Sequence, residues 1–323
     1  MTAPRSERFE SFLASVRQPP RTREEHESYD VWSLRGLEGD ERDEAERILI
    51  ERLETFDGDR RPVEALAVLG AAGSEGALKA LEDSVAKAVA TGHHGAALLV
   101  IQVLQDRRRV KKSDVIKVAV KSLRDGDFTA QTSAAALLAR VSPKRAPDEI
   151  LKVLATMPLD FVRGRLYDAL LTALGLKAGA HDPPGTLARL GVLVAGHTHA
   201  ARDAALAELT PIVEKVRAGK TGKSAGISKG SGKRAVGAVI DRLKRGEAPA
   251  RAEIDSLTDD GKAYVAAWCK AGVPSQVAAH YQTLEALGDT SALPIVDDAL
   301  TWDDDMLHGA RPHLERLRGA LSS

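Results

Sequence analysis

Hydrophobic and polar positions alternate with a period of three to four residues along most of the chain. In the range 45–53, apolar residues recur at spacings of three and four, and charged residues fill the positions between them. The ranges 115–123 and 203–216 show the same pattern. Residues three and four apart share one face of a helix, so these ranges predict amphipathic helices. Sustained alternation with period two, which indicates strands, is nearly absent. We therefore expect an all-α fold.

The sequence also has a second, longer period, in addition to the helical one. Ala/Leu-rich stripes recur along the chain, and their matching alanines lie 32 to 38 residues apart, at Ala65, Ala97, Ala135, Ala169 and Ala204. An amphipathic helix is predicted upstream of each stripe, and this period is close to that of two-helix repeats. One helix pair cannot bury such a stripe alone, so neighbouring pairs must cover it. Gly70, Gly175 and Gly288 are predicted to end helices in the left-handed conformation.

Two of these stripes carry a family resemblance. The ranges 61–70 and 161–175 both end in Leu-Gly, and Val162-Arg163 opens the second. They resemble the second helix of HEAT-like (armadillo-type) repeats, well over residues 37–217 and weakly over 259–320. The resemblance implies a right-handed α-solenoid of stacked two-helix HEAT-like repeats that presents a curved face to a partner. Ala97 and Ala135 lack the preceding Arg, so the repeat number stays open by one or two.

The predicted organisation has four parts. They are an N-terminal helical cap at 1–36, a repeat solenoid at 37–217, a flexible Gly/Ser/Lys loop at 218–232 and C-terminal helical repeats at 233–323. The loop is too polar and glycine-rich to contribute to a core. Within and beside it, 222–224, 226–230 and 230–235 resemble parts of a P-loop, a nucleophile elbow and a dinucleotide fingerprint. Each of those motifs follows a strand, and none is predicted here, so we interpret them as chance matches.

Charge is balanced in total but segregated along the chain, with 46 basic and 46 acidic residues. The candidate interaction residues form two basic tracts: Arg107, Arg108, Arg109, Lys111 and Lys112, then Lys215, Arg217, Lys220, Lys223, Lys229, Lys233 and Arg234. Acidic residues gather in two ranges, 24–59 and 289–305. The range 289–305 contains no basic residue. The basic tracts suit phosphates or an acidic protein surface, and the acidic ranges suit a basic partner. Solvated turns and helix faces are the structural alternative for both.

The residues with metal-binding, nucleophilic or aromatic chemistry give no catalytic constellation. The pairs His93-His94 and His197/His199 fall three repeats apart, too far to share a zinc ion, so we predict no metal and no cofactor. Cys269 is the single cysteine, and beside Trp268 it is expected to be buried and inert. Trp32, Trp268 and Trp302 are interpreted mainly as core residues, with a role as binding anchors as the alternative.

The chain is therefore expected to act by binding rather than by catalysis. We predict a non-catalytic protein-binding scaffold or adaptor, with an inhibitor or immunity-type partner of a basic protein as one form. The alternative is a nucleic-acid-binding helical-repeat protein that uses tracts 107–112 and 215–234. An enzyme of a HEAT-like type, such as a lyase that attaches bilins, is the third hypothesis. With no signal-like N-terminus and no long apolar run, we expect no membrane contact and a cytoplasmic location.

Overall fold

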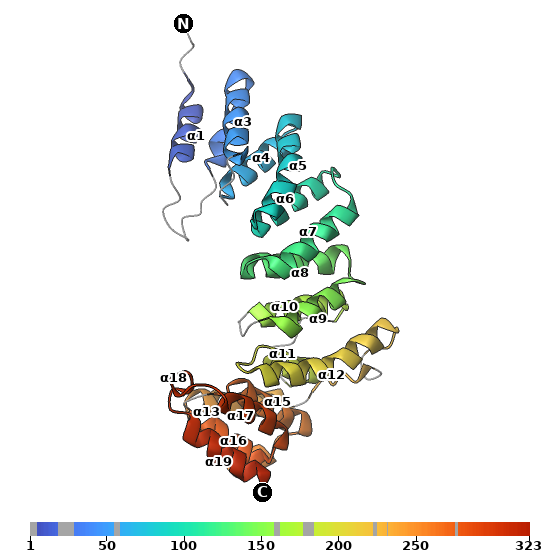
Figure 1. Cartoon of the computed structure of the whole chain (residues 1–323), viewed down its shortest axis with the longest axis vertical. Helices are drawn as coiled ribbons and strands as arrows, with labels where there is room; N and C mark the ends of the chain where they lie inside the picture. The colour runs from blue at the N-terminus through green and yellow to red at the C-terminus, as the bar shows by residue number, and fades with distance from the viewer. Residues whose placement is uncertain are drawn as a thin grey trace. The chain divides into compact units, whose positions relative to one another are not determined.

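The computed structural model describes residues 5–18, 29–54, 59–157, 162–176, 184–221, 225–230, 232–274 and 277–323. Across these ranges the fold is all-α: it holds nineteen α-helices and the 3₁₀ helix η2 (Thr290–Ala292), and no strand (Figure 1). The predicted fold class is thus confirmed at the level of secondary structure. The chain divides into two compact units, Met1–Val141 and Ser142–Ser323.

The first unit is built from helices that pack on their successors. Its helices are α1 (Glu7–Arg17), α2 (Val31–Arg35), α3 (Gly39–Glu54), α4 (Arg61–Ala71), α5 (Glu75–Ala90), α6 (His94–Asp106), α7 (Lys112–Asp125) and α8 (Phe128–Val141). From α3 to α8, each helix contacts the next one, and α3 to α6 also contact the helix after that. Figure 1 shows these helices following one another along the unit. The helices α3, α5 and α7 therefore form one row, and α4, α6 and α8 form the other.

Small side chains and short caps bring the two rows together. Ala65, Ala97 and Ala135 are fully buried, as their period predicts. Ser74 begins α5, where its hydroxyl accepts a hydrogen bond from the Ala77 amide at 3.1 Å. Gly70 lies inside α4 rather than at its end, and a Cβ there would approach Leu78 Cδ2 to 2.7 Å. Gly70 thus permits close packing of α4 on α5.

The second unit departs from successive packing. Its helices are α9 (Ala146–Thr156), α10 (Val162–Ala173), α11 (Thr186–Val194), α12 (His199–Arg217), α13 (Lys233–Lys244), α14 (Arg251–Asp255), α15 (Asp259–Ala271), α16 (Ala278–Leu287), α17 (Leu293–Leu300), α18 (Asp304–Leu307) and α19 (Arg311–Ser322). The helices α9 to α12 follow one another, but α11 also packs on α15, and α12 on α17. Near the C-terminus, α19 packs on both α16 and α17. Contacts between helices distant in sequence therefore close this unit.

Two expectations need correction here. Ala204 is exposed, and its neighbours Ala201 and Ala205 are the buried residues, so the alanine register shifts at α12. Gly175 and Gly288 have the predicted left-handed φ of 68° and 61°, whereas Gly70 is helical. Past α4, Gly73 takes the left-handed conformation instead, with φ 93°.

The range 218–232 is partly joined to the core. Ala225 and Ile227 are buried, contrary to the expectation that this range contributes nothing to packing. The Ser228 hydroxyl donates to Asp260 Oδ2 at 2.6 Å, and the Thr186 amide donates to the Ser228 carbonyl at 3.3 Å. These bonds connect the segment to α15 and to the start of α11. Along the sequence, the boundary between the two compact units falls between residues 141 and 142, inside the predicted solenoid range 37–217. The four predicted ranges stay predictions.

Candidate functional site

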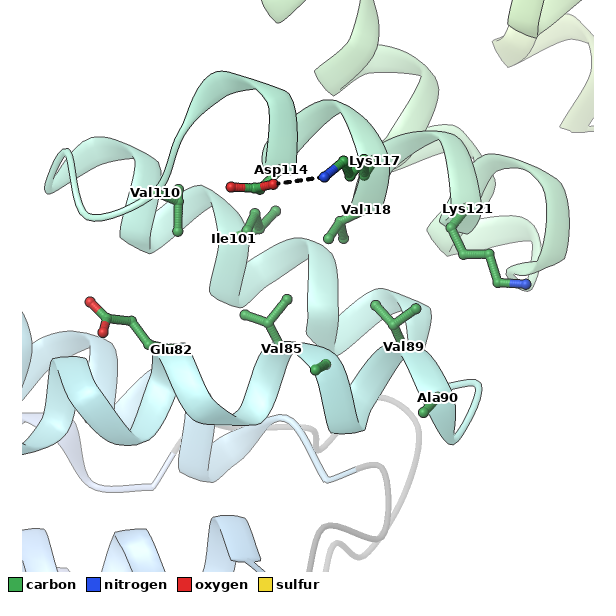
Figure 2. A pocket seen from close by; sticks show the side chains of 11 residues that line it. Glu82, Val85, Val89, Ala90, Ile101, Val110, Asp114, Lys117, Val118 and Lys121 are labelled. Carbon is green, nitrogen blue, oxygen red and sulfur yellow. Dashed lines mark hydrogen bonds and ion pairs between the residues drawn. The ribbon is translucent and has the colours of Figure 1, made fainter.

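An apolar groove runs between α5 and α7 on the first unit, with α6 beneath it (Figure 2). Its volume is ≈ 710 Å³. The residues that line it are Glu82, Val85, Ala86, Val89, Ala90, Ile101, Val110, Asp114, Lys117, Val118 and Lys121. Most of this lining is aliphatic, and the charged side chains stand on the rim.

Helical spacing explains how the groove arises. On α5, the lining positions 82, 85, 86 and 89 share one face, and on α7 the positions 114, 117, 118 and 121 do the same. Val85 and Val118 point toward one another from these two helices, with Ile101 of α6 between them (Figure 2). Ile101 is buried, whereas both valines are half-buried. The two helix faces thus leave aliphatic surface in contact with solvent.

The acidic side chains of the rim are held by basic neighbours. Arg109 Nε lies 2.7 Å from Glu82 Oε1, and its Nη1 lies 2.9 Å from Glu75 Oε2. The hydrogen bond to Glu82 raises the pKa of the Arg109 guanidinium above its ordinary value. Lys117 Nζ lies 3.3 Å from Asp114 Oδ1 (Figure 2). These pairs neutralise the carboxylates at the groove and leave an excess of positive charge nearby.

The first basic tract lies at one end of this groove. It forms the turn from α6 to α7, where Val110 reaches the groove lining and Arg109 turns toward α5. The other tract side chains, Arg107, Arg108, Lys111 and Lys112, are exposed. Between residues 107 and 125 the sequence has eight basic and two acidic residues. The tract and α7 thus make one basic border along the groove.

The described members of the second basic tract belong to the other compact unit. Arg217 Nη1 pairs with Asp148 Oδ1 at 2.7 Å, and its Nη2 donates to the Lys144 carbonyl at 3.2 Å, which holds the end of α12 to the start of α9. The other described members are exposed: Lys215, Lys220, Lys229, Lys233 and Arg234. Lys223 lies outside the described residues.

The acidic range 289–305 serves internal contacts in the second unit. Asp298 Oδ2 accepts a hydrogen bond from the Ala200 amide at 3.0 Å, at the start of α12. Asp289 pairs with Lys270 at 2.8 Å, and Asp297 with Arg318 at 2.8 Å. Asp304 pairs with Arg311. Most of these carboxylates therefore stabilise the unit itself.

In the acidic range 24–59, helix α3 carries acidic side chains that are exposed to solvent. Residues 24–28 and 55–58 lie outside the described part of the chain. One face of α3 forms a shallow hollow of ≈ 530 Å³ lined by Asp43, Glu46, Arg47, Ile50, Glu51 and Glu54. Glu46 accepts from the Ser74 hydroxyl at 2.5 Å, and Arg47 pairs with Glu51 at 2.6 Å. Asp43 and Glu54 are exposed, so this face keeps a negative character.

The aromatic and thiol predictions have mixed outcomes. Trp32 is 80% exposed, so its assignment to the core is wrong; the Arg35 guanidinium lies 5.8 Å from its ring. Trp268 and Trp302 are half-buried. Cys269 is fully buried, as predicted, and burial raises the pKa of its thiol far above the ordinary value. A raised pKa keeps the thiol protonated and hence a poor nucleophile.

The groove itself was missed at the level of sequence. Val85 and Val118 read as ordinary members of amphipathic helices, because the pattern does not show which helix covers which face. A usable signal existed on α5, where Val85, Ala86, Val89 and Ala90 form an aliphatic row beside the buried Leu81 and Ala88 row. Such a row is wider than a single partner helix needs.

Within the described residues, no group of three or more His, Cys, Asp and Glu side chains is arranged to hold a metal ion. His94 is buried and its Nδ1 lies 3.3 Å from the Ser122 hydroxyl. No helix in the described ranges has the length and apolar character needed to cross a membrane. No family model, no curated protein and no solved structure matches the chain.

Proposed function

We propose that this chain is a non-catalytic protein-binding scaffold whose α5/α7 groove receives a helix of a partner protein. The observation that carries the proposal is the half-buried aliphatic lining of that groove, including Val85, Val89 and Val118. Burying such surface contributes about 25 cal/mol per Å², so exposed aliphatic surface favours association. A groove between two helices also matches the way amphipathic helices are bound in other systems.

We further propose that the helices form HEAT-like repeats stacked in a right-handed solenoid. The support is the pattern of helix–helix contacts within α3 to α8, where a helix packs on its next neighbour and on the one after that. Stacked repeats have this order because each repeat contacts its neighbours alone. The α11–α15 contact in the second unit departs from it. The repeat proposal therefore rests on the first unit.

A paired substitution tests the role of the groove. Val85→Asp with Val118→Asp places two carboxylates on half-buried positions of the lining, and desolvating them opposes the docking of an apolar face. The matched control is Val216→Asp with Met306→Asp, which changes a half-buried valine and an exposed methionine in the second unit. Circular dichroism and thermal melting verify that both variants keep the helical fold.

The readout is affinity purification of the full chain from a native lysate, with quantitative mass spectrometry, followed by titration of the purified partner. We expect at least one protein that binds the wild-type chain and the control directly, and whose affinity falls at least about ten-fold with the groove variant. If every retained protein binds the groove variant as tightly as wild type, the groove is not the binding site.

The acidic face of α3 supports a second form of the same function, an inhibitor or immunity-type partner of a basic protein. Asp43 and Glu54 are exposed on the hollow described above. Charge complementarity speeds encounter and weakens with salt. We expect Asp43→Lys with Glu54→Lys to abolish binding of a basic partner that the groove variant still binds. A basic partner insensitive to this α3 variant contradicts this form.

Nucleic-acid binding is the alternative, supported by the exposed side chains Arg107, Arg108, Lys111 and Lys112. Two of the arginines that the sequence selects, Arg109 and Arg217, are engaged in internal ion pairs instead. Fluorescence anisotropy with a duplex of about 20 bp at about 50 mM salt tests this alternative, because phosphate contacts are strongest at low salt. We expect no saturable binding, and tight binding that falls steeply with salt would favour the alternative over the scaffold.

A further inference from the structure

We propose that the occupant of the α5/α7 groove is an acidic amphipathic helix of a partner protein. The aliphatic stripe of that helix would lie on the groove floor, and its carboxylates would face α7. This inference rests on the function proposed above and adds the chemical class of the partner. It follows from the shape of the groove, from the charge of its border and from the absence of aromatic side chains in its lining.

The shape suits a helix of two to three turns. The lining spans positions 82 to 90 of α5, a rise of about 12 Å at 1.5 Å per residue. Over that length, a bound helix presents aliphatic residues at i, i+3 or i+4, and i+7. An extended peptide gains affinity by pairing with a sheet edge, and the described part of the first unit contains no strand. A helix satisfies its own backbone hydrogen bonds and needs only side-chain contacts.

The charge of the border selects an acidic helix. Lys117 and Lys121 stand on the α7 side of the groove and pair with Asp114 and Asp125, and the exposed side chains of the basic tract add positive charge at one end. On the α5 side, Ala86 and Ala90 are exposed, and the Glu82 carboxylate is held by Arg109. Carboxylates on the partner would therefore meet lysines, whereas lysines on the partner would meet like charge.

The lining disfavours nucleic acid as the occupant. Its apolar members are valine, alanine and isoleucine, and no aromatic ring lies among the lining residues. Binding of single strands relies on stacking of bases on aromatic rings. A phosphate placed over Val85 and Val118 would lose hydration without a hydrogen-bond donor in return. The aliphatic floor matches an aliphatic stripe on a protein helix, and the basic border matches carboxylates on the same helix.

The neighbouring groove between α3 and α5 is a weaker candidate. Its volume is ≈ 320 Å³, less than half that of the α5/α7 groove. The rim lysines of both grooves are engaged: Lys79 pairs with Asp83 at 2.8 Å and Lys87 donates to the Glu54 carbonyl, whereas Lys117 and Lys121 pair with Asp114 and Asp125. The difference in charge comes from the exposed basic tract at the end of the α5/α7 groove. The α5/α7 groove thus combines the larger aliphatic surface with the more basic border.

Two synthetic peptides test the inference with the full chain. The Glu peptide is a stapled helix of about 16 residues, with leucines at i, i+3 or i+4, and i+7 and glutamates elsewhere. The Lys peptide has the same leucines and lysine in place of each glutamate. Binding of each fluorescent peptide is measured by anisotropy, with wild type, the groove variant Val85→Asp/Val118→Asp, and Lys117→Glu/Lys121→Glu. The matched lysine control is Lys220→Glu/Lys244→Glu, two exposed positions of the second unit.

We expect the Glu peptide to bind wild type at least about ten-fold more tightly than the Lys peptide. The groove variant loses this binding, Lys117→Glu/Lys121→Glu reverses the preference, and the lysine control keeps it. The reversal is decisive, because a variant that merely failed to fold would bind neither peptide. Circular dichroism confirms helicity for each variant.

The other outcomes separate the two proposals. If the Lys peptide binds equally or more tightly and the groove variant loses it, the acidic class is wrong while the groove function stands. If neither peptide binds, or if the groove variant binds both like wild type, the groove function falls as well. If a duplex of about 20 bp displaces the Glu peptide and also binds the groove variant, the basic border is a nucleic-acid surface and the inference is overturned.

Discussion

The interiors of the two compact units contain different kinds of polar side chain. Within the described residues, the buried polar positions of the first unit are Ser84, His94 and Ser122. The second unit buries four charged side chains, Glu149, Arg163, Arg202 and Lys270, together with Thr198, His280 and Thr283. In the first unit, charge therefore stays at the surface, where it borders the α5/α7 groove. In the second unit, charge is used for internal contacts.

Those internal contacts connect segments that lie far apart in sequence. Arg202 Nη1 donates to the Met157 carbonyl at 3.0 Å, which ties α12 to the end of α9. Lys270 ties α15 to Asp289, just before η2. The first unit also has polar contacts between helices, such as Arg109–Glu82 and Ser74–Glu46, but their side chains are half-buried or exposed, whereas Arg202 and Lys270 are buried. We infer that the first unit presents a surface for binding, and that the second depends on directional polar contacts.

The largest expected effect comes from a substitution that creates a cavity in the apolar interior of the first unit. Leu104 on α6 is fully buried. Leu104→Ala is expected to lower the free energy of unfolding by about 3 kcal/mol, from lost burial plus the cavity that remains. Native-state hydrogen exchange of α6 amides measures this loss for the first unit separately. Leu104→Met is the matched control, and a loss below about 1 kcal/mol for Leu104→Ala would contradict close apolar packing.

An ion pair between buried Lys270 and half-buried Asp289 in the second unit should give the next largest effect. Burial opposes ionisation of Asp289, but hydrogen bonds from Lys270 and Ser291 outweigh it and lower the pKa of that carboxyl. Lys270→Met leaves the carboxylate without this partner and should cost the second unit about 2 kcal/mol. Adding Asp289→Leu should restore most of the loss. A single variant as stable as wild type would show that the pair does not support this unit.

His280 predicts a smaller effect, confined to mildly acidic pH. It is buried, its ring lies 4.9 Å from that of Trp268, and burial lowers its pKa below the ordinary value. Below a pH of about 6.5 the unfolded chain binds this proton more readily than the folded chain, so stability falls as pH decreases from there. Thermal melts from neutral to mildly acidic pH should show this decline for wild type and for the exposed control His199→Leu. His280→Leu should reduce it, and an unchanged decline would contradict the assignment.

The smallest effect is expected at Trp32. The side chain is 80% exposed on α2, so Trp32→Ala should change stability by no more than about 0.5 kcal/mol. The matched buried position is Phe9 on α1, which has no exposed surface, and Phe9→Ala should cost about 3 kcal/mol. Chemical denaturation compares the two variants. Equal losses would mean that Trp32 is covered in solution.

Much of the first unit could be predicted from the sequence. The period of Ala65, Ala97 and Ala135 places a buried alanine in each of α4, α6 and α8, because stripes that repeat must cover one another. The same argument failed at Ala204, where the buried register moves by one residue and α12 packs on the distant helix α17. Periodicity shows that a helix has an apolar face but does not identify its partner.

The groove and the ties of the second unit lie beyond such a pattern. Val85 and Val118 are 33 positions apart, and only the packing of α5, α6 and α7 brings them to one surface. Ser228 reads as part of a flexible segment, yet it bonds to Asp260 and to Thr186. Basic tracts are visible in sequence, but whether an arginine is internally paired, as Arg109 and Arg217 are, depends on distant acids.

Hydrogen–deuterium exchange of the full chain, with and without the Glu peptide, shows where on the molecule the peptide binds. We predict slower exchange in residues 82–90 and 110–121, on both sides of the groove, and unchanged exchange in 278–300 of the second unit. Protection confined to other residues, or no protection at a saturating concentration of the peptide, would contradict the assignment of the α5/α7 groove as the binding site.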